Sequence, residues 1–241
     1  MTTHQFPKVR GEPGAGTIGV ISGELARYSH FSVAMLHLQV PEGSKLAWDP
    51  SANITGQCNN LIKFARKTGA EWLWMIGDDH VFDPTIINRL LAHNVDVIVP
   101  NCLQRSAPFN PVVYEGLNEE GHHKILDDLP EAGLTEVYAA GSAGMLIRRH
   151  VFDAIPEPAF STSEGHQNED LEFCRKVREA GFRIWIDPEV LLAHIGTMVV
   201  WPHYMEEYGW GAILDLGPPV DGREQRMPVR RIAHGPSLTA A

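Results

Sequence analysis

Two aspartates and a histidine directly follow one of the most apolar stretches of this 241-residue sequence. Asp78, Asp79 and His80 come after the run "EWLWMIG", which is typical of a buried strand. Unpaired charges are costly inside a protein, so such groups are usually paired, solvated or bound to a metal. Because side chains alternate along a strand, we expect Asp78 and His80 on one side, and Asp79 on the other side or closing the turn. One divalent ion could then be shared by Asp78 and His80; the alternative is a loop in which both aspartates bind backbone N–H groups.

A second histidine, His194 in "LLAHIG", stands at the end of another strand-like segment. A mixed set of carboxylate and imidazole ligands with open positions suits Mn²⁺ or Mg²⁺ holding a phosphate-bearing substrate. We therefore predict one metal site formed by Asp78, His80 and His194, which requires the fold to bring residues 80 and 194 together. Taken alone, His194 would be read as an ordinary loop histidine.

Two further acidic residues, Glu169 and Asp170, open the helical pattern "EDLEFCRKVRE". Acidic residues are common in the first turn of a helix because they complement the helix dipole. The alternative is a carboxylate directed into a cleft, which acts as a general base if it stays ionised beside an acceptor hydroxyl. The residues alone leave both interpretations open.

The segments that must position these residues alternate between strands and helices over the first hundred positions. Strand patterns end near Ser22, Gly77 and Pro100, and helical patterns with apolar residues three and four apart lie between them. This alternation predicts an α/β fold with one mostly parallel central sheet and helices on both faces. Ligands bind such folds beyond the carboxyl ends of the strands, where Asp78 and His80 stand.

The domain organisation is expected to be simple. The composition, 44% hydrophobic, supplies a core for one large domain, which we assign to residues 17–216. We predict a flexible N-terminus over residues 1–16 and a Pro/Gly-rich C-terminal arm over residues 217–241.

The charge and the cysteines restrict the partners and the compartment. A formal net charge of -10 argues against broad binding to nucleic acids. The three cysteines, Cys58, Cys102 and Cys174, are far apart and form no CxxC pair, which favours buried, reduced thiols. Neither a long apolar run nor a hydrophobic signal core is found, so the sequence predicts a cytoplasmic protein without a membrane segment.

Three stretches in a fixed order resemble the nucleotide-sugar-dependent glycosyltransferases of the GT-A fold, and within them the family 2 group. "WLWMIGDDHVFDP" is similar to the apolar strand, DxD-type motif and helix start of that family. "AAGSAGMLIRRHVFDAI" resembles its Gly-rich strand, and "GHQNEDLEFCRKVREAGFRIWIDPEVLLAHIG" resembles its ED pair, helix and late histidine. The resemblance covers residues 17–196 and implies a single GT-A (Rossmann-like) domain, with residues 17–114 binding the nucleotide and residues 115–216 the acceptor.

The resemblance implies a role for each residue of the first motif. Asp78 and His80 fall on the outer positions of DxD, which hold the metal that bridges the donor diphosphate, and Asp79 between them is counted with the donor-binding residues. The third position is His instead of Asp, a DxH form, which strengthens His194 as a further ligand. The implied cofactor is Mn²⁺ or Mg²⁺, and the implied donor is a UDP-sugar.

The ED pair carries the expected catalysis. Asp170 falls on the position that family 2 enzymes use as the base, with Glu169 beside it. The resemblance thus implies an inverting transfer of a sugar to a hydroxyl acceptor such as a glycan, a protein, a small molecule or a modified nucleobase. A DxH motif also occurs among retaining relatives, so retaining transfer is the alternative outcome on the same fold.

Contacts to the base and ribose are made after the first two strands in the family. This places Ser22, Gly23 and Asp49 at the donor, with Asn60 as a further contact. Arg105, in "NCLQRSAP", could meet the donor phosphate or sugar. Asp49 could equally be a turn or cap residue, and Arg105 an ordinary surface arginine.

Two other classes of function compete with a glycosyltransferase. A metal-dependent phosphoesterase also places Asp and His at strand ends, but the further ligands that it needs are not found at plausible strand ends. A catalytically inactive nucleotide-sugar-binding module would keep the fold and lose the chemistry, against which the intact Asp78, His80, Asp170 and His194 argue.

Overall fold

The computed structural model describes residues 8–9, 14–23, 29–49, 53–105, 109–162, 168–196, 199–206, 209–215 and 226–229. The chain divides into two compact units, Met1–Leu103 with Pro111–Ile195, and Gln104–Asn110 with Gly196–Ala241. The predicted flexible N-terminus, residues 1–16, and the predicted arm, residues 217–241, lie largely outside the described residues. The domain boundaries at these positions therefore stay predictions.

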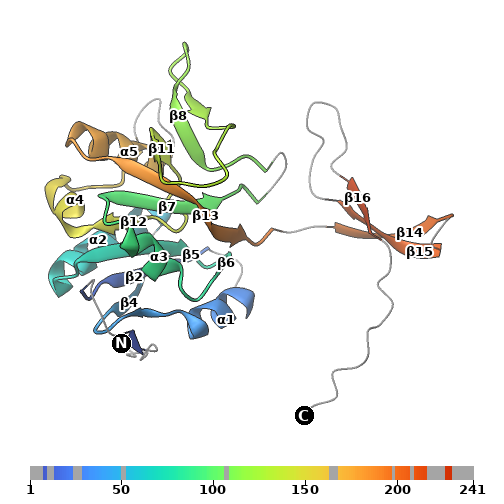
Figure 1. Cartoon of the computed structure of the whole chain (residues 1–241), viewed down its shortest axis with the longest axis horizontal. Coiled ribbons are helices and arrows are strands. Elements are labelled where there is room, and N and C mark those ends of the chain that lie inside the picture. Colours follow the sequence, from blue (N-terminus) through green and yellow to red (C-terminus); the bar gives the residue numbers. More distant parts are fainter. Residues whose placement is uncertain are drawn as a thin grey trace. The chain divides into compact units, whose positions relative to one another are not determined.

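An eight-stranded sheet forms the centre of the first unit (Figure 1). Its strand order is β10-β13-β7-β12-β5-β2-β4, and β6 pairs with β13. The strands are β2 (Thr17–Ile21), β4 (Lys45–Trp48), β5 (Trp72–Gly77), β6 (His80–Phe82), β7 (Val97–Cys102), β10 (Thr135–Val137), β12 (Leu146–Arg148) and β13 (Ile184–His194).

The direction of the strands agrees with the predicted fold class. The pairings of β2, β4, β5, β7 and β13 make these five strands run the same way, whereas β6, β10 and β12 run against them. The antiparallel β12 lies between β5 and β7, so it starts at the edge where its two neighbours end. The α/β class with a mostly parallel sheet is therefore confirmed.

The strand β5 shows how the sequence builds two cores on one sheet. Its residues from Trp72 to Ile76 are all buried, as expected for a strand with helices on both faces. Leu73 and Met75 belong to one hydrophobic cluster and Trp74 to the other, which follows from the alternation of side chains along a strand.

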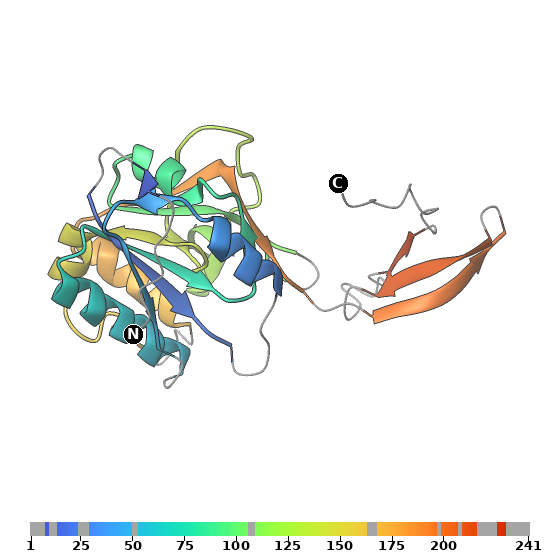
Figure 2. The ribbon, with the colours of Figure 1, turned by 90° about the horizontal axis from the view of Figure 1, so that it is seen from below.

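Helices cover both faces of the sheet, as predicted (Figure 2). One face carries α2 (Ile54–Thr68), α4 (Arg149–Ala154) and α5 (Glu169–Glu179), and the other carries α1 (Ser29–His37) and α3 (Ile86–Ala92). The helix α2 begins at Asn53, whose side chain accepts a hydrogen bond from the Gly56 N–H at 2.8 Å, and ends at Gly69 in the left-handed conformation.

Smaller sheets complete each unit. In the first unit, β1 (Lys8–Val9) pairs with β3 (Val40–Pro41), and β8 (Val113–Leu117), β9 (His123–Ile125) and β11 (Ala139–Ala140) form a three-stranded sheet. In the second unit, β14 (Val199–Met205), β15 (Gly209–Asp215) and β16 (Arg226–Val229) form an antiparallel sheet. No helix among the described residues has the length and apolar character needed to cross a membrane.

Candidate metal and donor site

The predicted site residues gather where the parallel strands end. Ser22 and Gly23 follow β2, Asp49 follows β4, Asp78 follows β5, and His194 is the last residue of β13. Carboxyl ends of parallel strands share one edge of a sheet, so residues from distant parts of the sequence meet there.

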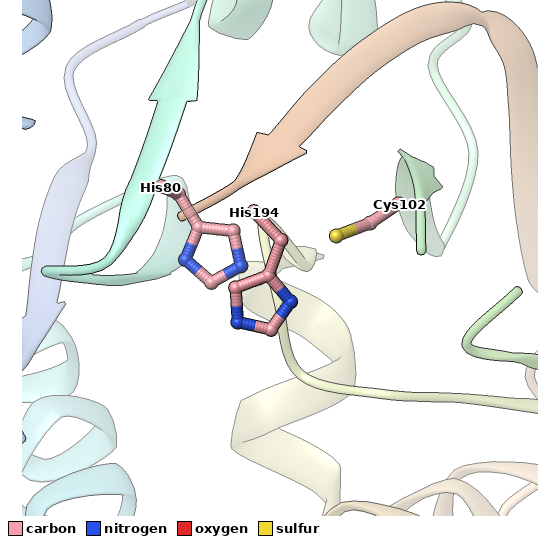
Figure 3. A group of neighbouring side chains, drawn as sticks. All are labelled: His80, Cys102 and His194. Carbon is pink, nitrogen blue, oxygen red and sulfur yellow. The ribbon is translucent and has the colours of Figure 1, made fainter. Parts of the chain in front are cut away.

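His80 and His194 lie directly against each other. They are opposite residues in the antiparallel pairing of β6 with β13, and their rings stack with centroids 4.4 Å apart and planes 19° apart (Figure 3). His80 is 4% exposed, whereas the His194 side chain is partly exposed. The fold thus brings residues 80 and 194 together, which the predicted metal site requires.

Asp79 contacts both histidines. Its Oδ1 lies 3.0 Å from Nδ1 of His80, and its Oδ2 lies 3.2 Å from Nε2 of His194. Of the two arrangements expected for Asp79, the structure has the one in which it closes the turn, because β5 ends at Gly77 and strand alternation does not apply to residues 78–79. Although burial opposes it, hydrogen bonds with His194 and His80 hold the pKa of Asp79 well below its usual range. The same contact, against burial, raises the pKa of His194 to about 10.

Two backbone carbonyls orient the imidazole rings. Nδ1 of His80 lies 3.2 Å from the Gly77 carbonyl oxygen, and Nδ1 of His194 lies 3.0 Å from the Leu103 carbonyl oxygen. A carbonyl can only accept, so each Nδ1 carries a proton. In His80 this leaves Nε2 with a lone pair, whereas Nε2 of His194 faces the Asp79 carboxylate and donates to it. Nε2 of His80 is buried and has no hydrogen-bond partner among the described residues. An orphaned nitrogen of this kind, on a ring held by a carbonyl, fits a metal ion.

Cys102 is a member of this group that the sequence reading missed. His80, Cys102 and His194 each offer a ligand atom, and the three atoms lie within 4.8 Å of one another. All three cysteines are free and buried, as predicted, but only the position of Cys102 at the end of β7 hinted at a role. Since β7 and β13 are parallel neighbours, with Cys102 opposite Leu192, their last residues converge.

Asp78, the other residue of the turn, contacts the loop after β2. Its Oδ1 accepts a hydrogen bond from the Gly23 N–H at 3.1 Å, and its side chain is buried. The carboxylate therefore joins the end of β5 to the loop after β2. This contact agrees with the alternative in which an aspartate of the motif binds a backbone N–H.

A second missed residue, Gln57 of α2, holds the same loop. Its Oε1 accepts from the Ser22 N–H at 2.8 Å, and its Nε2 donates to the Ser22 carbonyl at 3.2 Å. The Trp48 indole donates to the Ser22 hydroxyl at 2.5 Å. Gln57 is 3% exposed, so these bonds are formed away from water and fix the loop after β2.

The remaining candidates for donor contacts differ in their surroundings. Asn60 of α2 donates to the Asp49 carboxylate at 2.5 Å, so the end of β4 and one face of α2 are joined as neighbours. Arg105 is exposed and belongs to the second compact unit.

Asp170 lies in the first turn of α5, in a setting unlike that of an ordinary surface acid. Burial raises its pKa to about 6, and the charge of Glu169 adds to this rise, whereas N–H donors of Leu171 and Ser142 oppose it. A Cβ added to Gly141 would lie 3.5 Å from Oδ2 of Asp170. The carboxyl group is thus held against the segment that leads into β12.

A ladder of backbone hydrogen bonds connects Asp170 with the histidine cluster. The Gly141 N–H donates to the Val112 carbonyl at 2.8 Å, and the Val112 N–H donates to the Cys102 carbonyl at 3.2 Å. The path from Cys102 to Asp170 consists of two steps between hydrogen-bonded backbone segments, through Val112 to Gly141, and of the close approach of Gly141 to the Asp170 side chain. Neighbouring strands are about 5 Å apart, so the whole path is at most roughly 15 Å long. The base candidate and the metal candidate are therefore linked through the backbone that follows β7 and β11.

Comparisons with known proteins support the fold and leave the family open. No family model and no curated protein matches the sequence. Among solved structures, A197 from STIV is similar with a TM-score of 0.51 and 15% identity, over 91% of this chain and 98% of that chain. GalNAc-T7 with UDP, GalNAc and Mn²⁺ is similar with a TM-score of 0.54 and 11% identity, over 77% of this chain and 44% of that chain. At these identities the likeness shows the fold alone: the chain has a GT-A-like, glycosyltransferase-type fold.

Proposed function

We propose that the chain is a metal-dependent glycosyltransferase of the family 2 type, which moves a sugar from a nucleoside-diphosphate donor to a hydroxyl acceptor. UDP is the nucleotide that we expect, in keeping with the structure of GalNAc-T7, which was solved with UDP and Mn²⁺. The observation that supports this proposal most is the stacking of His80 on His194 at the carboxyl edge of a GT-A-like sheet.

The metal site would be built from His80 and His194. The Asp78 carboxylate, the third predicted ligand, accepts from the Gly23 N–H and would have to turn toward the histidines to join them. A divalent ion bound there supplies positive charge that neutralises the departing nucleoside diphosphate. Asp79 acts as a positioning residue, because its two oxygens contact both rings. The buried Nε2 of His80 supports a ligand role, since without an ion this atom would lack any partner among the described residues.

Asp170 would act as the general base. It accepts the proton of the acceptor hydroxyl while the acceptor oxygen attacks the anomeric carbon and the bond from that carbon to the diphosphate oxygen breaks. A single displacement of this kind inverts the anomeric centre. A pKa of about 6 suits the task, because the carboxylate is ionised at neutral pH and still basic enough to take a proton.

The nucleotide would bind beside the loop after β2. Ser22 and Gly23 are held there by Gln57 and Asp78, so their backbone is fixed before a ligand arrives. Asp49 and Asn60 lie beyond the end of β4 and on α2 and would meet the base or ribose. Arg105 belongs to the second compact unit and stays a donor contact predicted from the sequence alone.

Calorimetric titration with UDP, in the presence and absence of Mn²⁺, tests this proposal. We expect UDP binding that requires the metal, followed by slow hydrolysis of one or more UDP-sugars in a donor screen. A chain that ignores UDP but cleaves simple phosphate esters would contradict the proposal. Binding of UDP without any donor turnover would instead indicate an inactive binding module.

A further inference from the structure

A thiol lies among the proposed metal ligands. Cys102 is 2% exposed, and its Sγ belongs with His80 and His194 to the group whose ligand atoms lie within 4.8 Å of one another. In the part of the chain that the structure describes, no other three His, Cys, Asp or Glu residues come together in this way. Figure 3 shows the Cys102 side chain pointing toward the two imidazole rings.

The spacing of the three atoms fits one small ion. Bonds to a tetrahedral Zn²⁺ are about 2.0 Å long for nitrogen and about 2.3 Å for sulfur. Donor atoms up to 4.8 Å apart therefore need to move inward by only about 1 Å each to meet such an ion.

The orientation of the rings supports the same assignment. The Gly77 carbonyl accepts from Nδ1 of His80 and leaves its Nε2 for an ion. His194 has Nδ1 on the Leu103 carbonyl and Nε2 on Asp79, so one of these two contacts gives way when this ring binds the ion. Leu103 is the residue next to Cys102, so the end of β7 supplies both the carbonyl that orients His194 and the thiol. Nε2 of His80, buried and without a partner in the described structure, is the atom that an ion would satisfy.

We propose that Cys102 is a ligand of the metal centre, and that its sulfur makes the site selective for Zn²⁺ or Co²⁺ over Mg²⁺ and Mn²⁺. The proposal rests on the metal site of the proposed function but not on sugar transfer. Mg²⁺ and Mn²⁺ favour oxygen ligands, whereas Zn²⁺ and Co²⁺ bind imidazole and thiolate well. On binding, the thiol proton leaves to solvent and the sulfur coordinates as a thiolate.

Titration of the full chain with Co²⁺ and with Zn²⁺ tests the proposal. The Co²⁺ complex is expected to show a thiolate-to-cobalt charge-transfer band in the near ultraviolet. In Cys102→Ala this band is lost, the Zn²⁺ affinity falls by at least ~100-fold, and the Mn²⁺ affinity changes by less than ~3-fold. The matched control is Cys58→Ala, another buried cysteine, which keeps both the band and the affinities; far-ultraviolet circular dichroism checks that each variant folds.

Three results would overturn this assignment. They are the absence of the band in a wild-type chain that binds Co²⁺, an unchanged preference for Zn²⁺ over Mn²⁺ in Cys102→Ala, and a failure of the wild type to bind either Co²⁺ or Zn²⁺. The first result needs no variant, so it holds even if Cys102→Ala does not fold. Metal-dependent UDP binding is measured separately. A thiolate band without UDP binding would refute the proposed transferase but support Cys102 as a ligand. UDP binding without a thiolate band would refute Cys102 as a ligand and leave the proposed transferase standing.

Discussion

Replacement of Asp170 by asparagine should make the protein more stable at alkaline pH and abolish transfer. The carboxyl group has a pKa of about 6 in the folded chain, against 3.8 for an unperturbed aspartate, chiefly because burial disfavours its charged form. The folded state therefore holds this proton more tightly than the unfolded state does. The stability that the group contributes is fully present below pH 3.8 and is lost as the pH rises through about 6.

The size of this effect follows from the two pKa values. The difference between about 6 and 3.8 corresponds to about 3 kcal/mol at full ionisation, and partial exposure of Asp170 reduces this to about 2 kcal/mol. Asp170→Asn cannot ionise, so at pH 8 its free energy of unfolding should exceed that of the wild type by this amount. At pH 4 the advantage should largely disappear.

Urea denaturation of both chains at pH 4, 6 and 8 measures the difference, with the exposed Asp128→Asn as the control that should show no such trend. The rate of sugar transfer supplies an independent reading, since it should rise about tenfold per pH unit below pH 6 and level off above it. Glu169→Gln removes the neighbouring charge, which should lower the pKa of Asp170 and shift the rising part of the pH–rate profile to lower pH. A stability gain that is the same at pH 4 and pH 8, or full turnover by Asp170→Asn, would refute the reasoning.

Three further changes probe the rest of the site. His80→Ala and His194→Ala should each weaken metal-dependent UDP binding at least ~tenfold by calorimetry, whereas replacement of the exposed His122 by alanine should not. Wild-type affinity in both His80→Ala and His194→Ala would show that neither histidine is a ligand. Asp79→Asn should lower metal affinity by roughly 10- to 100-fold, because one amide cannot accept from both rings, and an unchanged affinity would show that the carboxylate does not position them. Gln57→Ala leaves the buried N–H and carbonyl of Ser22 without their side-chain partner, so it should lower the free energy of unfolding by about 2 kcal/mol in urea titrations and weaken UDP binding. A loss of stability below about 0.5 kcal/mol would contradict the role of Gln57 in holding the loop after β2.

The strands of the sheet and the helices beside it could be predicted from the sequence because the patterns that indicate them lie within short stretches of residues. The apolar run of β5 and the periodic pattern of α2 mark elements whatever lies beside them. Strand ends in an alternating α/β chain share one edge, which is why His80 and His194 could be assigned to one site before their pairing was known.

Other features of the site depend on contacts between distant segments. Gln57 reaches Ser22 only because α2 packs beside β2, and Cys102 reaches the histidines only because β7 and β13 are neighbours. For Asp79 the sequence left two arrangements open, and the turn at residues 78–79, which ends the alternation of the strand before it, decides between them. Neither the order of the strands nor the exact end of β5 is encoded in any single stretch of sequence.

The antiparallel course of β12 gives the second half of the first unit an unusual freedom to diverge. Between β7 and β12 the chain adds β10 to one edge of the central sheet and then returns to its middle through Gly144, whose positive φ and close approach to Pro100 suit only glycine. Residues inserted or deleted along this detour need not shift the register of the strands on either side. Relatives could thus differ in this segment while the histidine pair stays in place.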